Sequence, residues 1–149
     1  MTPSQADYLD SLPFTLTIPH RRVLVVHAGV VPGNPLPEQN LVDLYQMRDL
    51  KKKGHSWVAL ELATADTTAW AKEWKGEYHI FFGHDAKRRL QFHRYATGLD
   101  SGCCYGGQLT ACILPRTADV SRDSSAGATR EALGAEMVSV QAKKDYREK

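Results

Sequence analysis

The chain has 149 residues, which is enough for one domain with its own hydrophobic core. Hydrophobic residues make up 42% of it and charged residues 24%, as in an ordinary soluble globular domain, and the formal net charge of +2 gives no argument for binding DNA or an anionic membrane. No apolar run is long enough for a membrane-spanning helix, and the N-terminal residues lack a signal-peptide pattern, so we expect a cytoplasmic protein.

The first third of the chain contains two runs typical of strands. One alternates between apolar and polar residues, and the other is a continuous apolar run that ends at His27, as in strands buried on both faces. The predicted elements are, in order, a short helix over 7–12, strands over 14–18 and 23–27, a loop over 29–37 and a helix over 38–50.

The rest of the chain mixes short apolar runs with glycine-rich and polar segments. Its predicted elements are a basic solvated loop over 51–55, a helix from Thr67 or Thr68 to Gly76, a strand over 79–82, a glycine-rich turn over 98–107, a strand over 109–114, a flexible loop over 116–135, and a last strand with a charged tail over 136–149. Strands and helices alternate irregularly, so the expected class is α/β (α+β) with a mixed sheet.

Two histidines lie at the ends of predicted strands. His27 precedes Gly29 after one buried run, and His84 follows Gly83 after another. Strand ends at one rim of a sheet are where α/β folds place their chemistry, and neutral imidazole binds transition metals well. Two histidines are too few for a catalytic metal site, however, so spacing alone favours histidines hydrogen-bonded at strand ends.

Other candidate residues each allow a functional and a structural interpretation. Asp85 is a carboxylate that would either orient an imidazole or cap a following helix. Arg48 would either bind phosphate or complement a helix C-terminus at the surface. The basic segment 51–55 is more typical of a solvated loop than of a phosphate site. The glycines around Tyr105 would either approach a ligand closely or form a tight hairpin.

The three cysteines are odd in number and clustered, which favours reduced thiols over a disulfide framework. Their spacing does not match a zinc site, and a Cys/His nucleophilic pair has no local signature in its favour. The cysteines are Cys103, Cys104 and Cys112.

Four segments of the chain match family motifs in order. The segment 25–33 (VVHAGVVPG) is similar to the stretch VHAGxxPG, and 44–48 (LYQMR) is similar to an MR segment. The segments 70–86 and 98–111 are similar to the stretches WAxxWxGP…FGHDA and GLDTGCxYGGxLTA, with Ser101 in place of threonine and Glu77 in place of proline. Through these motifs the chain resembles the calcineurin-like metallophosphoesterases, and within them the ApaH-like branch of the phosphoprotein phosphatase (PPP) superfamily.

The resemblance implies a β-sandwich flanked by helices with a two-metal centre at the strand ends. It implies that His27 and His84 ligate one of two divalent ions (Mn, Fe, Zn or Co) and that Arg48 contacts substrate phosphate. Asp85, Asp100 and Tyr105 would lie near the site. The reaction would be attack of a metal-bound hydroxide on the phosphorus of a nucleotide, capped RNA or phosphoprotein, as in serine/threonine phosphatases.

The resemblance also implies missing motifs. The family's GDxHG, GDxxDRG and GNHE motifs, which supply most metal ligands and the catalytic histidine–acid pair, do not occur here. Residues 1–115 therefore resemble the C-terminal half of the domain, with an incomplete metal site and no catalytic residue of the family's set. Two hypotheses follow: an inactive fragment of a phosphatase, or a degenerate non-catalytic binding module (a pseudophosphatase).

Overall fold

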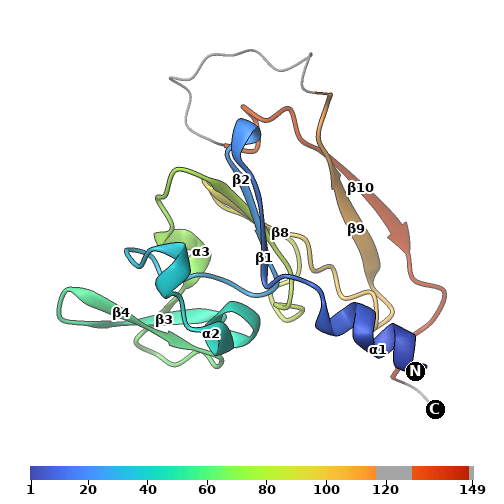
Figure 1. The fold of residues 1–149 in the computed structure, drawn as a ribbon, viewed down its shortest axis with the longest axis horizontal. Helices are drawn as coiled ribbons and strands as arrows, with labels where there is room; N and C mark the ends of the chain where they lie inside the picture. The colour runs from blue at the N-terminus through green and yellow to red at the C-terminus, as the bar shows by residue number, and fades with distance from the viewer. Residues whose placement is uncertain (117–128, 148–149) are drawn as a thin grey trace.

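The computed structural model describes residues 1–116 and 129–147, which form a mixed α/β structure of short helices and small sheets (Figure 1). The helices are α1 (Pro3–Asp10), α2 (Leu41–Gln46) and α3 (Trp70–Glu73), with 3₁₀ turns at Pro19–Arg21 and Leu36–Glu38. The strands are β1 (Thr15–Ile18), β2 (Val23–Val26), β3 (Asp49–Lys53), β4 (Ser56–Leu60), β5 (Thr67–Ala69), β6 (His79–Phe82), β7 (Gln91–Phe92), β8 (Ala96–Gly98), β9 (Gln108–Ile113) and β10 (Glu136–Gln141).

The largest sheet has five strands in the order β1-β2-β6-β8-β7. Its middle strands β2, β6 and β8 run parallel, and β1 and β7 pair antiparallel at the edges. All four residues of β6 are buried, as expected of a central parallel strand. The fold class and the strands expected over 14–18, 23–27 and 79–82 are therefore confirmed.

The main core lies between this sheet and the segments α2 and α3. Trp70, Ile80 and Leu50 are almost fully buried within it, and the Trp70 ring meets Phe82 edge-on with centroids 4.8 Å apart. Burying a side chain of this size contributes about 1.5–3 kcal/mol. These contacts fix α3 and β3 against the carboxyl ends of β2 and β6.

The segment expected to be a helix over 38–50 followed by a loop is different in the structure. The helix α2 is short, and the lysine-rich residues after it form β3, which pairs with β4 and β5 in an antiparallel sheet of order β4-β3-β5. Gly54 and His55 connect β3 to β4, and Gly54 has φ of +62°, which glycine adopts readily. The expectation of a loop over 51–55 is wrong for 51–53, because cross-strand pairing, rather than burial of an apolar face, orders these exposed residues; 54–55 do form a turn.

Two other boundaries also differ. Thr67 and Thr68 belong to β5 instead of starting a helix, and α3 begins only at Trp70. Gly98 ends β8, so the glycine-rich turn is shorter than expected. The strands expected over 109–114 and from 136 onward pair with each other as β9 and β10. Residues 117–128 of the loop expected over 116–135 lie outside the described residues.

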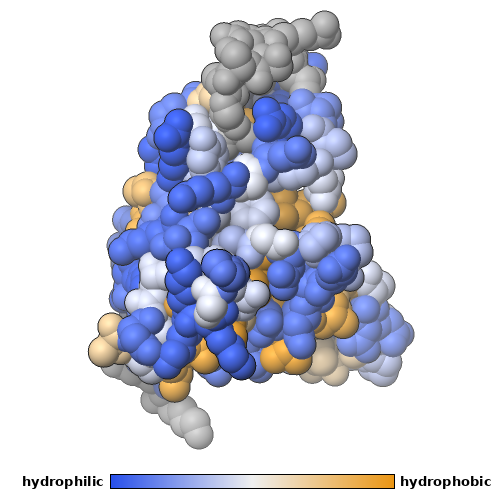
Figure 2. All heavy atoms as spheres, turned by 90° about the vertical axis from the view of Figure 1, so that its left-hand side faces the viewer, coloured by the Kyte–Doolittle hydropathy of each residue, from blue (hydrophilic) through white to orange (hydrophobic). Residues whose placement is uncertain are grey.

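The face that carries the β3–β4 hairpin is mainly hydrophilic, with apolar side chains in smaller areas between charged ones (Figure 2). Within the described residues, no helix has both the length and the apolar character that crossing a bilayer requires.

Candidate metal centre

The two strand-end histidines lie side by side because their strands are parallel neighbours in the sheet. Val25 of β2 pairs with Phe81 of β6, and beyond the strands the amide of Gly83 donates to the carbonyl oxygen of His27 at 2.9 Å. The His27 and His84 rings are 5.1 Å apart between centroids and tilted by 52°. One small ligand can therefore be reached by both rings.

His84 has an unusual backbone and an unpartnered ring nitrogen. Its φ is +66°, in the left-handed region that few non-glycine residues adopt. Its Nε2 is buried and has no hydrogen-bond partner among the described residues. Burial, followed by the nearby charge of Arg48 and then that of His27, lowers the pKa of His84 from 6.5. Neutral imidazole, the form that ligates metals, is thus favoured at position 84.

Arg48 lies beside His84, at the start of β3. One guanidinium nitrogen is 3.2 Å from the carbonyl oxygen and 3.4 Å from Oε1 of Glu61, and another approaches the His84 carbonyl oxygen at 3.5 Å. Its Nε is buried without a partner in the described part of the chain. These contacts are long, so the guanidinium keeps donors for an oxyanion next to the histidine pair.

Gly29 leaves room for Trp70 and Met47, which pack against the backbone just after His27. A Cβ at this position would lie 2.6 Å from Trp70 Nε1 and 2.9 Å from Met47 Cγ, so only glycine fits here without displacing its neighbours. The VHAG segment therefore combines a histidine at the strand end with a close approach of backbone to the core.

Asp85 does not cap a helix, because residues 86–88 form a turn in the structure. It is buried, and its Oδ2 accepts from Arg88 at 2.7 Å and from the amide of Gln91 at 3.1 Å. The same arginine binds both carboxylate oxygens of Asp49 at 2.9 Å. Asp85 is thus one of two buried acids that share Arg88 behind the histidine.

The glycine-rich turn holds the other sequence candidates. Asp100 accepts from the amide of Gly102 at 2.9 Å, which stabilises the turn. Tyr105 is 41% exposed and stacks on the guanidinium of Arg147 at 4.6 Å. The contacts of these two side chains are within the turn and to the C-terminal segment. Cys103, Cys104 and Cys112 are free thiols.

The histidine pair fits part of a metal site. Two imidazoles share a rim, and the buried Nε2 of His84 lacks a partner, which a coordinated ion would supply. Among the described residues, no group of three or more histidine, cysteine, aspartate or glutamate side chains comes together. The donors present are two of the set that a catalytic ion requires.

The network around Arg88 was not predicted from the sequence. Arg88 and Asp49 lie 39 residues apart and meet only because β3 packs beside the turn after β6. Glu61, the partner of Arg48, comes from the end of β4, 13 residues away. The sequence offers one signal for such a contact. Asp49 directly follows Arg48 at the start of a strand, and a carboxylate that is buried there needs a cationic partner.

Two known proteins similar in sequence to this chain carry one and the same name. No family model matches this chain. The asymmetrical bis(5′-nucleosyl)-tetraphosphatase PrpE of Bacillus thuringiensis (strain Al Hakam) is 30% identical over 121 residues, which are 76% of this chain and 44% of that protein. PrpE of Geobacillus thermodenitrificans (strain NG80-2) is 38% identical over 56 residues, 38% of this chain and 23% of that protein.

A solved structure agrees with these relatives. The crystal structure of a candidate diadenosine tetraphosphatase superposes with a TM-score of 0.78 at 33% identity, covering 95% of this chain and 56% of that one. The chain spans about half the length of the Bacillus thuringiensis protein and of the protein in this solved structure. Sequence motifs, fold and relatives agree: the chain corresponds to part of a metallophosphoesterase of the ApaH-like branch.

Proposed function

We propose that this chain supplies the histidine and arginine side of a phosphoesterase site that acts on nucleotides of the dinucleoside polyphosphate type. The observation that supports it is the pair of rings 5.1 Å apart, with an unpartnered Nε2 on His84 and Arg48 beside it. The relatives named as tetraphosphatases favour this substrate class over capped RNA or a phosphoprotein.

In this proposal His27 and His84 hold one divalent ion through neutral imidazoles. Such an ion would neutralise charge on phosphoryl oxygens and lower the pKa of water. Arg48 binds an oxygen of the same phosphate and fixes its orientation, with Glu61 holding the guanidinium in place. The hydrogen bond from the Gly83 amide to the His27 carbonyl oxygen keeps the two ligand-bearing strand ends in register.

The remaining ligands would come from polypeptide outside the described residues. Because the described residues offer two imidazoles and no carboxylate that joins them, we expect this chain alone to bind metal weakly and not to turn over substrate. Where such ligands are supplied, the same residues would be essential. The alternative, a non-catalytic binding module, has the same absence of a third ligand in its favour.

A chimera tests the function directly. The matching 44% of Bacillus thuringiensis PrpE is replaced by this chain, and hydrolysis of diadenosine tetraphosphate is measured with Mn²⁺. We expect turnover that is lost in His27→Ala and His84→Ala and retained in His55→Ala, whose ring is exposed in the β3–β4 turn. A folded chimera without turnover would favour the non-catalytic module.

Metal binding by the chain itself is a second readout that does not depend on activity. Titration with Co²⁺, followed by visible absorption or calorimetry, should give one ion per chain. Replacing either His27 or His84 with alanine should weaken binding at least about tenfold, whereas His55→Ala should not. Equal affinities in all variants would remove the histidine pair from the proposal.

A further inference from the structure

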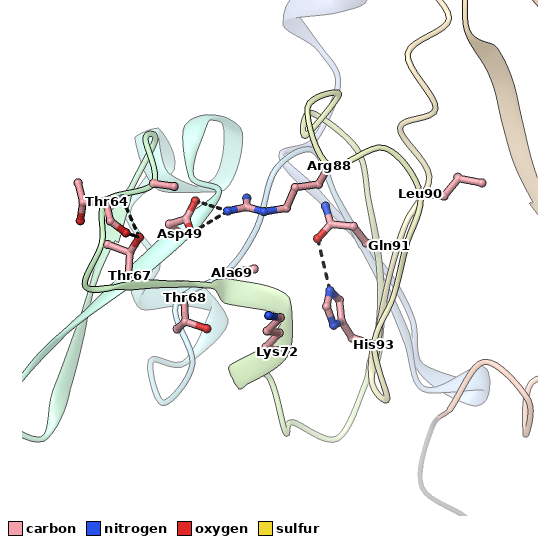
Figure 3. A pocket seen from close by; sticks show the side chains of 11 residues that line it. Asp49, Thr64, Thr67, Thr68, Ala69, Lys72, Arg88, Leu90, Gln91 and His93 are labelled. Carbon is pink, nitrogen blue, oxygen red and sulfur yellow. Dashed lines mark hydrogen bonds and ion pairs between the residues drawn. The ribbon is translucent and has the colours of Figure 1, made fainter.

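A hollow lies between the β4-β3-β5 sheet and the turn after β6. Its volume is about 470 Å³, and residues of β3, β5, α3 and the β7 region line it, among them Asp49, Lys72, Arg88, Gln91 and His93. Figure 3 shows Arg88 reaching across from its turn to Asp49, with Lys72 and His93 below it on opposite sides of the gap. Neither His27 nor His84 lines this hollow.

Around the hollow, the acidic side chains are buried and the basic ones are more exposed. The side chains of Asp49 and Asp85 are 3% and 6% exposed, and both accept hydrogen bonds from Arg88. The Arg88 side chain is 32% exposed, and the exposed Lys72 forms no salt bridge in the described part of the chain. The acids therefore lie behind the arginine, and the cations border the open space.

The pKa of His93 indicates that the electrostatic potential in the hollow is positive. Its pKa is lowered from 6.5, first by burial and then by the charges of Lys72 and Arg88. The groups that face His93 are Lys72 from α3, Arg88 from the turn and, through Gln91, Asp85, with Asp49 of β3 behind Arg88. The two cations thus prevail over the buried acids at the imidazole.

The hydrogen bonds fix the tautomer of this histidine. Gln91 donates its amide nitrogen to Asp85 at 3.1 Å, so its Oε1 is the acceptor in the 3.3 Å contact with His93 Nε2. Nε2 therefore carries the proton. Nδ1 has no hydrogen-bond partner in the described part of the chain, so it can take up another proton when an anion arrives. Gaining that proton turns Nδ1 into a donor for an oxyanion.

We propose that this hollow is a second phosphate-binding site, separate from the histidine pair, in which Lys72, His93 and the outer edge of Arg88 receive the phosphate group of a small molecule. The volume exceeds what one phosphate needs and is within the range of small-molecule sites. Ala63, Ala69 and Leu90 give apolar walls next to the charged groups, which suits a phosphate monoester such as a nucleotide. The inference does not rest on the proposed function.

The first experiment is calorimetry of the full chain with inorganic phosphate and, in a parallel arm, with adenosine monophosphate. Tighter binding of the nucleotide would identify a phosphate monoester as the ligand, and equal binding would identify the free phosphate ion. Lys72→Gln should weaken either by about fivefold. Lys75→Gln is the matched control, because Lys75 is exposed nearby but does not line the hollow.

The second experiment follows the imidazole resonances of His93 by NMR between pH 5 and 8. Saturating phosphate should raise the pKa of His93, and Lys72→Gln should reduce this rise. Arg48→Ala separates the two sites, since it should leave binding in the hollow intact. Binding that Arg48→Ala abolishes and Lys72→Gln leaves unchanged would overturn this inference while supporting the proposed function. An unchanged pKa of His93, or no binding by a chain that melts normally, would also overturn it.

Discussion

At the scale of single residues, the two glycines beside the histidines do different things although the motifs look alike. Gly29 is pressed against Trp70 and Met47, and a Cβ there would lie within 3 Å of both. A Cβ on Gly83 would meet only the carbonyl oxygen of His27, at an ordinary 3.7 Å. One glycine is required for packing, and the other has room for a methyl group.

This difference gives a matched pair of variants. Gly29→Ala should lower the free energy of unfolding by about 1–3 kcal/mol, because the methyl group overpacks the core. Gly83→Ala should lower it by less than about 1 kcal/mol, since its φ is not in the left-handed region and its contact is ordinary. Urea unfolding of both variants measures the difference. Equal losses would show that Trp70 shifts at little cost.

At the scale of elements, the β3–β4 hairpin depends on its two-residue turn. Lys53 pairs with Ser56 across Gly54 and His55, and Gly54 takes a positive φ of 62° with open space around it. A glycine at the first turn position is typical of the tight turns that match the twist of antiparallel strands.

Replacing this glycine should therefore act through the backbone alone. Gly54→Ala should cost about 1–2 kcal/mol, because an L-residue at positive φ is strained. Gly54→Asn should cost less, since asparagine tolerates that conformation. Urea unfolding gives the totals, and faster amide exchange in β3 and β4 should locate the effect. No loss in Gly54→Ala would mean that the hairpin is not held by its turn.

Burial decides which elements could be predicted from the sequence. The strands β2 and β6 are buried on both faces, so their apolar runs give their position nearly to the residue. In β3 only Asp49 and Leu50 are buried, and three exposed lysines follow. The strand β3 is held by pairing with β4 and β5, and the hydrophobic periodicity of a sequence does not indicate which strands pair. The Gly-His pair at 54–55 was the available turn signal.

Some contacts of the candidate site could likewise be predicted from the sequence, and others could not. His27 and His84 end consecutive members of the parallel sheet, so their approach follows from the strands themselves. Arg48 and Glu61 meet through the register of β3 against β4, and Arg88 reaches Asp49 through the packing of two sheets. Contacts that depend on the register of a polar sheet could not be predicted from this one sequence.

At the scale of the whole molecule, one face of the β9–β10 ribbon is apolar and exposed. Leu109 and Val140 are directly opposed and are 65% and 66% exposed, and Ile113 and Val138 lie along the same face. The other face carries Thr110, which is buried. An exposed apolar face of this kind favours association or dye binding.

We therefore expect the chain alone to bind the dye ANS and to self-associate. The double variant Leu109→Lys/Val140→Lys should reduce both, because charges on paired positions keep the face hydrated and disfavour stacking. ANS fluorescence and light scattering measure the two effects. A control is Lys75→Gln, which lies away from the ribbon. Negligible dye binding by the unaltered chain would contradict this expectation.

The left-handed backbone at position 84 also restricts how this protein can diverge. Besides glycine, asparagine and aspartate are the residues that most readily accept such a backbone, as histidine does here. A lineage in which selection on the imidazole relaxes should therefore accumulate glycine, asparagine or aspartate at this position, rather than the glutamine or tyrosine expected at an ordinary surface site. The residue found at position 84 in related sequences would thus record whether the proposed role of this imidazole was kept or lost.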